Sequence, residues 1–197
     1  TYFYNLSITR EDIENALFFK ILKTNSWQII FKYILNDLVN NKKKNFIFGD
    51  KTPRYLTNLN ILHRIYPNAK FLHIIRDPRD QCISARKIWK KSIYRSAQIW
   101  KDSIENAREV VLKSNLDYLE VKYEDLLENP EFTITEICQY LHCDYSQSML
   151  LFKDSVENYG DAKDSYIIKK DNYNKFKEIL STPEIKKIER ITFTIMK

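Results

Sequence analysis

The chain has 197 residues, 44% of them hydrophobic and 29% charged, and a formal net charge of +6 at neutral pH. This length suits one domain with a real core, no apolar run approaches the roughly 20 residues that span a bilayer, and the scattered lysines do not indicate nucleic-acid binding. The three cysteines form no CxxC pair, which predicts no zinc site and suits a cytoplasmic location, and the two glycines, Gly49 and Gly160, cannot build a glycine-rich phosphate loop.

The first part of the chain predicts two helices and a strand. The helices cover residues 9–23 and a stretch that begins at Ser26, where apolar residues recur at helical spacing. A basic run at 42–44, which we interpret as a solvated loop, leads to a short buried strand, NFIFG, at 45–49.

The central part alternates strands with helices. The predicted elements are a helix at 56–65, a buried strand at 70–75, helices at 77–91 and 94–113, and a strand at 117–123. This βαβαβ order predicts an α/β fold with a parallel sheet flanked by helices on both faces. Such sheets bind ligands at the carboxyl ends of their strands.

The last part predicts a helix from Pro130 to His142, a helical turn near 146–152, a polar loop to about Asp171 and two final helices. The chain begins with Thr1, not with methionine, and its last helical pattern stops without a cap signal. We therefore expect both ends to be truncated.

Arg76 marks a candidate anion site, because it follows a predicted strand directly and precedes a helix. Asp77 is the predicted N-cap and Pro78 the first helical residue. Ser84 lies two turns along the same helix, and a helix start favours anions. Arg76 and Ser84 could therefore bind one phosphate. The alternative is a surface charge beside an ordinary cap and an ordinary helical serine.

Two further residues are predicted at the same edge of the sheet. Lys51 follows the first strand in GDKTP, one βαβ repeat before Arg76, and Tyr123 ends the third strand. A second cation and an aromatic face beside an anion site indicate a nucleotide or a similar ligand. The alternatives are a lone exposed lysine and a tyrosine packed in the core.

Three segments, in this order and spacing, resemble the PAPS-dependent sulfotransferase family, in particular its bacterial and tyrosylprotein branch. They are GDKTPRYL (49–56), YPNAKFLHIIRDPRDQCIS (66–84) and YLEVKYEDLLENPEFTITEICQYL (118–141). The end of the chain, from KKDNYNKF onward, is similar to the family's C-terminal segment. A Lys-Trp pair is common there, and this chain has Lys175-Phe176.

The resemblance implies a P-loop NTPase-like fold and transfer of a sulfuryl group from PAPS, without a metal, to a hydroxyl or amine. Family acceptors are small alcohols, sugars and protein tyrosines. Arg76 and Ser84 match the family's site for the 3′-phosphate, and Tyr123 matches the tyrosine that contacts the adenine. Lys51 matches the lysine beside the transferring sulfuryl group, and Lys175 is the nearest match to a lysine that approaches the donor.

Two departures from the family pattern stand out. The glycine-containing loop that binds the 5′-phosphosulfate is missing, and no catalytic base is placed, since Pro53 stands where some branches have histidine. Glu11, Asp12 and Glu14 fit the first turn of a helix better than a base. We therefore expect residues 1–197 to be an inactive fragment of a sulfotransferase catalytic domain. The alternative is a non-catalytic module of the same fold that binds an anion or a nucleotide.

Overall fold

The structure, a computed structural model, describes residues 47, 49–151 and 168–196. The helices predicted at 9–23 and from Ser26, the basic run at 42–44 and most of the polar loop after residue 151 lie outside these ranges. The chain divides into two units, residues 1–68 and residues 69–197, and each is described by itself.

In the first unit, the helix predicted at 56–65 is confirmed from Leu59 onward. A 3₁₀ helix, η2 (Pro53–Asn58), leads into α3 (Leu59–Ile65), and the Tyr66 amide donates to the Leu62 carbonyl, 2.7 Å away, just before Pro67. Of the strand predicted at 45–49, Ile47 and Gly49 are described and are not in a strand.

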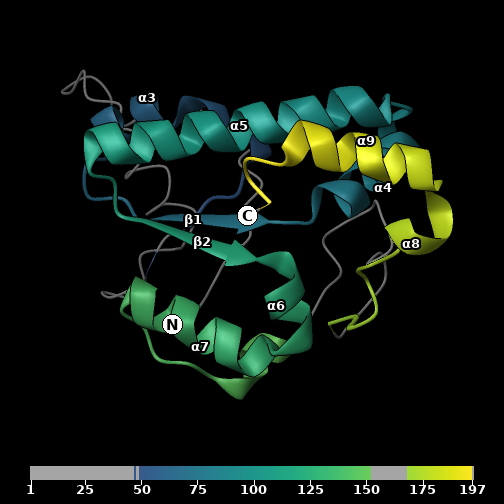
Figure 1. The fold of residues 1–197 in the computed structure, drawn as a ribbon. Coiled ribbons are helices and arrows are strands. Elements are labelled where there is room, and N and C mark those ends of the chain that lie inside the picture. Colours follow the sequence, from purple (N-terminus) through teal and green to yellow (C-terminus); the bar gives the residue numbers. More distant parts are fainter. Residues whose placement is uncertain (1–46, 48, 152–167, 197) are drawn as a thin grey trace, which may run out of the picture. The chain divides into compact units, whose positions relative to one another are not determined.

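The second unit contains the predicted parallel strands. β1 (Phe71–Ile75) pairs with β2 (Tyr118–Lys122) in a register that runs from Phe71 opposite Tyr118 to Ile75 opposite Lys122. The connection between them contains α4 (Pro78–Trp89) and α5 (Ile93–Ser114). Figure 1 shows α4, α5 and α9 on one side of the two strands and α6 and α7 on the other. This confirms the predicted fold class, a parallel sheet flanked by helices.

Burial on β1 differs from the expectation for a strand covered on both faces. Leu72 is 38% exposed and Ile74 is 47% exposed, whereas Phe71, His73 and Ile75 are half-buried. In the part of the chain that the structure describes, the packed helices leave these two apolar side chains accessible, so the predicted two-sided burial is wrong for them.

A short helix that the sequence analysis missed follows β2 without a loop. Tyr123 is the first residue of α6 (Tyr123–Glu128), not the last residue of the strand, and α7 (Pro130–Leu141) comes next. The remaining elements are η3 (Gln147–Leu150), α8 (Phe176–Ile179) and α9 (Thr182–Thr192). Cys143 lies just beyond α7, outside any helix. None of the described helices is long and apolar enough to cross a membrane.

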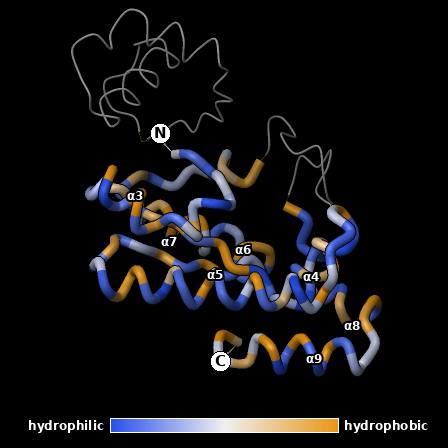
Figure 2. The backbone as a smooth tube through the Cα atoms, turned by 90° about the horizontal axis from the view of Figure 1, so that it is seen from above, coloured by the Kyte–Doolittle hydropathy of each residue, from blue (hydrophilic) through white to orange (hydrophobic). Residues whose placement is uncertain are grey.

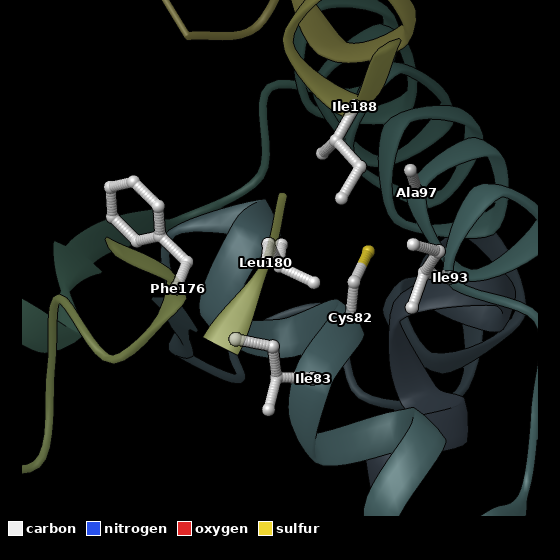
Figure 3. Close-up of a cluster of buried hydrophobic side chains, with 7 residues drawn as sticks. All are labelled: Cys82, Ile83, Ile93, Ala97, Phe176, Leu180 and Ile188. Carbon is white, nitrogen blue, oxygen red and sulfur yellow. The ribbon is translucent and has the colours of Figure 1, made fainter. Parts of the chain in front are cut away.

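The core of the second unit joins the C-terminal elements to α4 and α5. Apolar and polar residues alternate along α9, as Figure 2 shows, which lets one face pack inward. Figure 3 shows buried side chains from the helices α4, α5, α8 and α9 and from Leu180, which directly follows α8. They are Cys82, Ile83, Ile93, Ala97, Phe176, Leu180 and Ile188. Burial raises the pKa of the Cys82 thiol to about 12, so this cysteine acts as an apolar core residue.

Candidate functional site

The carboxyl ends of β1 and β2 bring a cation and an aromatic ring together. Ile75, the last residue of β1, is paired with Lys122, the last residue of β2. Arg76 and Tyr123 directly follow these two residues, so both lie at the same edge of the sheet. The guanidinium carbon of Arg76 lies 4.9 Å from the centroid of the Tyr123 ring. This distance fits a cation–π contact, and the predicted proximity of Arg76 and Tyr123 is confirmed.

Asn172, which the sequence analysis did not single out, contacts both of these residues. Its side-chain amide Nδ2 donates to the Tyr123 hydroxyl over 2.8 Å, and its backbone carbonyl accepts from Arg76 Nη2 over 3.0 Å. Asn172 is only 6% exposed. It belongs to residues 168–176, here called the strap, which pass this edge of the sheet and lead into α8.

Hydrogen bonds hold the backbone at Arg76 and at Asp77, where α4 begins. The Asp77 carboxylate accepts from the Arg79 amide over 2.8 Å, which confirms Asp77 as the N-cap. The Asp77 amide donates to Glu124 Oε1 over 3.0 Å, and Trp100 Nε1 donates to the Arg76 carbonyl over 3.1 Å. The backbone that carries Arg76 is therefore held by α5 and α6 as well as by its own helix.

Arg79, the next arginine along α4, is occupied by ion pairs within the protein. Its guanidinium contacts Asp77 at 2.6 Å and Glu189 at 2.7 Å, and it lies 3.9 Å from the centroid of the Phe176 ring. The hydrogen bonds that Arg79 donates to Asp77, aided by the negative charges of Asp77 and Glu189, raise the pKa of Arg79 despite its partial burial. Arg79 therefore ties α4 to α9, whereas Arg76 faces the strap.

The strap is also anchored to α4 at its end. The Phe176 amide donates to Asp80 Oδ1 over 2.9 Å, and both residues are buried. Lys175 is the N-cap of α8 and is half-buried, three residues from Asn172 on the same segment. The structure thus places Lys175 near the end of the strap, while its proposed contact with a donor stays a prediction.

Ser84 and Lys51 are described, but their predicted roles stay predictions. Ser84 is half-buried on α4, two turns after the Asp77 cap, as its spacing predicted. Lys51 is exposed just before η2 in the first unit, and its position beside Arg76 also stays a prediction. The upstream carboxylates Glu11, Asp12 and Glu14 lie outside the described residues.

An open pocket of about 810 Å³ lies where the strap passes the junction of α6 and α7. Glu128, Phe132 and Lys170 are among the residues that line it. A hydrogen bond from Tyr173 to Glu128 raises the pKa of this tyrosine. In the described ranges, no group of three histidine, cysteine or acidic side chains is arranged to hold a metal ion.

Two solved structures have a similar fold. The sulfotransferase domain from the Synechococcus PCC 7002 olefin synthase matches with a TM-score of 0.63 and 20% identity, over 98% of this chain and 78% of that domain. The sulfotransferase domain from the curacin biosynthetic pathway matches with a TM-score of 0.63 and 19% identity, over 93% of this chain and 77% of that domain. These matches confirm the predicted sulfotransferase fold.

Curated relatives match parts of the sequence. The omega-hydroxy-beta-dihydromenaquinone-9 sulfotransferase Stf3 of Mycobacterium tuberculosis is 25% identical over 107 residues, 46% of this chain and 27% of that protein. A Caenorhabditis elegans protein named "Putative protein-tyrosine sulfotransferase" is 29% identical over 122 residues, 58% of this chain and 47% of that protein. The matched region thus spans less than half the length of either relative.

A larger part of the sequence matches a family model. The model of the sulfotransferase family covers residues 5–147, well over half of the chain, including β1, β2, Arg76 and Tyr123. Together with the fold, this match confirms the predicted family: the chain belongs to the sulfotransferases.

Proposed function

We propose that the full-length protein transfers a sulfuryl group from PAPS to a hydroxyl or amine acceptor. Family membership supports sulfuryl transfer in general. The observation that carries the choice of donor is the Arg76 guanidinium 4.9 Å over the Tyr123 ring at the carboxyl edge of the sheet. Such a pair, a fork of donors for phosphate beside an aromatic residue that can contact the base, suits a phosphorylated purine nucleotide.

In this proposal Arg76 and Ser84 bind the 3′-phosphate, Tyr123 contacts the adenine and Lys175 approaches the donor from the strap. The acceptor oxygen or nitrogen attacks sulfur in line, the bond from sulfur to the bridging oxygen of PAPS breaks, and the proton of the acceptor is released to solvent. Lys51 neutralises the negative charge that develops on this leaving oxygen. As in phosphoryl transfer, positioning and charge stabilisation supply most of the catalysis.

The names of the relatives favour a hydroxyl acceptor over an amine. One relative is named for an omega-hydroxy menaquinone and the other for protein tyrosine, and both of these acceptors carry hydroxyl groups. We therefore propose a hydroxyl group on a small molecule, a sugar or a protein tyrosine. A non-catalytic nucleotide-binding module is the second candidate, because residues 1–197 contain only two glycines and no glycine-rich phosphate loop.

Two measurements on the full-length protein test the proposal. Calorimetry with adenosine 3′,5′-bisphosphate measures donor-site binding, and transfer from ³⁵S-labelled PAPS to an alkyl alcohol, a phenol, a sugar and a tyrosine peptide measures activity. We expect both binding and transfer. Binding without transfer to any of these acceptors would favour the non-catalytic module, and absence of binding would contradict the proposed donor site.

A further inference from the structure

We propose that Asn172 is a positioning residue of the donor site, which sets the Tyr123 hydroxyl to donate its hydrogen bond toward the adenine. The inference rests on the proposed function, in which Tyr123 contacts that base. It adds a role for a residue to which neither the family resemblance nor the strand-end pattern assigns one, because Asn172 lies in the strap and not at the end of a strand.

The geometry of Asn172 links the two halves of the donor site. Its amide Nδ2 is 2.8 Å from the Tyr123 hydroxyl, and its carbonyl oxygen is 3.0 Å from Arg76 Nη2. Asn172 is 94% buried, since its relative exposure is 6%. One buried residue therefore contacts both the proposed phosphate ligand and the proposed adenine contact.

The direction of the bond to Tyr123 has a chemical consequence. A tyrosine hydroxyl can donate one hydrogen bond and accept others, whereas an amide NH₂ group can only donate. Because Asn172 donates, it occupies an acceptor position on the Tyr123 oxygen and leaves the hydroxyl hydrogen free to point elsewhere. The unprotonated ring nitrogens of adenine are acceptors, so a hydroxyl held in this state suits them.

Unsatisfied atoms in the same cluster support a functional explanation. Asn172 Oδ1 and Arg76 Nε are both buried, and neither has a hydrogen-bond partner in the described part of the chain. A buried polar atom without a partner costs stability, and an apolar side chain at residue 172 would avoid that cost for Oδ1. An asparagine is therefore better explained by what its Nδ2 does to Tyr123 than by packing alone.

A double-mutant cycle in the full-length protein tests the coupling. Calorimetry with adenosine 3′,5′-bisphosphate is carried out on wild type, Asn172→Ala, Tyr123→Phe and the double variant. Each single change should weaken binding about three- to tenfold, the range of one neutral hydrogen bond. Because Asn172 acts through the hydroxyl, adding Asn172→Ala to Tyr123→Phe should cost less than about twofold more. Single losses that multiply in the double variant would overturn the inference.

Two controls separate positioning from damage to the strap. Asn172→Ala should weaken binding of adenosine 5′-monophosphate and of the 3′,5′-bisphosphate by the same factor, because the backbone carbonyl that holds Arg76 remains. A distorted strap would release Arg76 and change that ratio, which would contradict a role through Tyr123.

Asn174→Gly, on the same strap, should leave binding unchanged, since Asn174 is exposed and its φ of 60° suits glycine. If wild type binds neither nucleotide, the proposed function fails; if it binds and Asn172→Ala has no effect, only this inference fails.

Discussion

At the scale of single residues, Arg76 gives the most direct test of the donor site. Arg76→Ala removes a charged hydrogen-bond partner, and such bonds contribute about 1.5–3 kcal/mol each. Since roughly 1.4 kcal/mol corresponds to a factor of ten, affinity for adenosine 3′,5′-bisphosphate should fall about ten- to a hundredfold in calorimetry. Ser84→Ala removes a neutral donor and should cost less.

The same variants should barely affect a nucleotide that lacks the 3′-phosphate, because that phosphate is the proposed contact of both side chains. Arg86→Ala is the matched control, since Arg86 is also on α4 but contacts Glu184 at 3.4 Å. Equal losses for nucleotides with and without the 3′-phosphate would reject the phosphate contact. Arg76 would then serve to hold the strap through Asn172.

Lys51 should behave differently, because its proposed role arises only as the reaction proceeds. Its charge matters most when the leaving oxygen becomes negative, so Lys51→Ala should keep donor affinity within a few-fold and lose most turnover. Binding and ³⁵S transfer by the full-length protein measure the two effects, with the exposed Arg54→Ala as a control from the same segment. A large loss of affinity with little loss of turnover would assign Lys51 to donor binding.

The residues of the site differ in how far the sequence could predict them. Arg76 follows one predicted strand and Tyr123 ends another, so the parallel-sheet pattern alone places both at one edge of the sheet. Asn172 donates to Tyr123 from 49 residues away and accepts from Arg76 across 96 residues. It lies in an aperiodic strap, and no local pattern encodes contacts of that range.

At the scale of elements, a polar network on β1, β2 and α5 should make their packing sensitive to pH. His73 Nδ1 lies 2.6 Å from the Tyr118 hydroxyl, and Arg108 contacts Glu120 at 2.7 Å. Burial lowers the pKa of His73 despite the opposing charge of Glu120. Burial also opposes ionisation of Glu120, but the hydrogen bonds and charge of Arg108 outweigh it and lower its pKa.

Both lowered pKa values, that of His73 and that of Glu120, make the folded protein less stable in acid than at neutral pH. The unfolded chain takes up a proton at His73 below its ordinary pKa of 6.5, before the folded protein does, so stability should fall as the pH drops below about 6.5. The part due to Glu120 is present above its ordinary pKa of 4.5 and is lost as the pH falls through its lower folded value. Acid should therefore weaken this packing in two steps.

His73→Gln tests the first step. Urea unfolding between pH 7.5 and 5.5 should show a smaller loss of stability for this variant than for wild type, because it removes the titrating group. The control is His142→Asn, which changes an exposed histidine whose φ of 56° asparagine tolerates. A pH dependence unchanged in His73→Gln, or equally reduced in His142→Asn, would show that the network does not cause it.

The elements that the sequence missed are short or begin without a boundary signal. α6 has six residues and starts directly at the end of β2, with Glu124 and Asp125 in its first turn. Six residues are too few to show a helical period, and the sequence pattern assigns the first of them, Tyr123, to the end of the strand. The longer helices α4 and α5 were predicted close to their observed bounds. Asp77 and Pro78 mark the start of α4, and a helical pattern that extends over several turns is easier to recognise than one of six residues.

At the scale of the whole molecule, the C-terminal segment completes the core of the second unit. Ile188 of α9 and Phe176 of α8 pack in the same buried cluster as Cys82 of α4 and Ala97 of α5. The sequence predicted a final helix, but not the helices that it contacts, because Cys82 and Ala97 lie roughly 90 to 106 residues before Ile188 in the chain. The strap is consequently fixed at its end by the main core.

Ile188 tests how strongly that core depends on α9. It is fully buried, so Ile188→Ala should lower the free energy of unfolding by about 2–5 kcal/mol, and Ile188→Val by about 0.5–1.5 kcal/mol. Leu112→Ala, at a side chain that is 85% exposed, is the control and should change it by less than about 0.5 kcal/mol. Urea unfolding of the full-length protein, followed by tryptophan fluorescence, measures all three. Equal stability of Ile188→Ala and Leu112→Ala would mean that α9 is dispensable for the core, and the strap would then depend on Asp80 and Asn172 for its position.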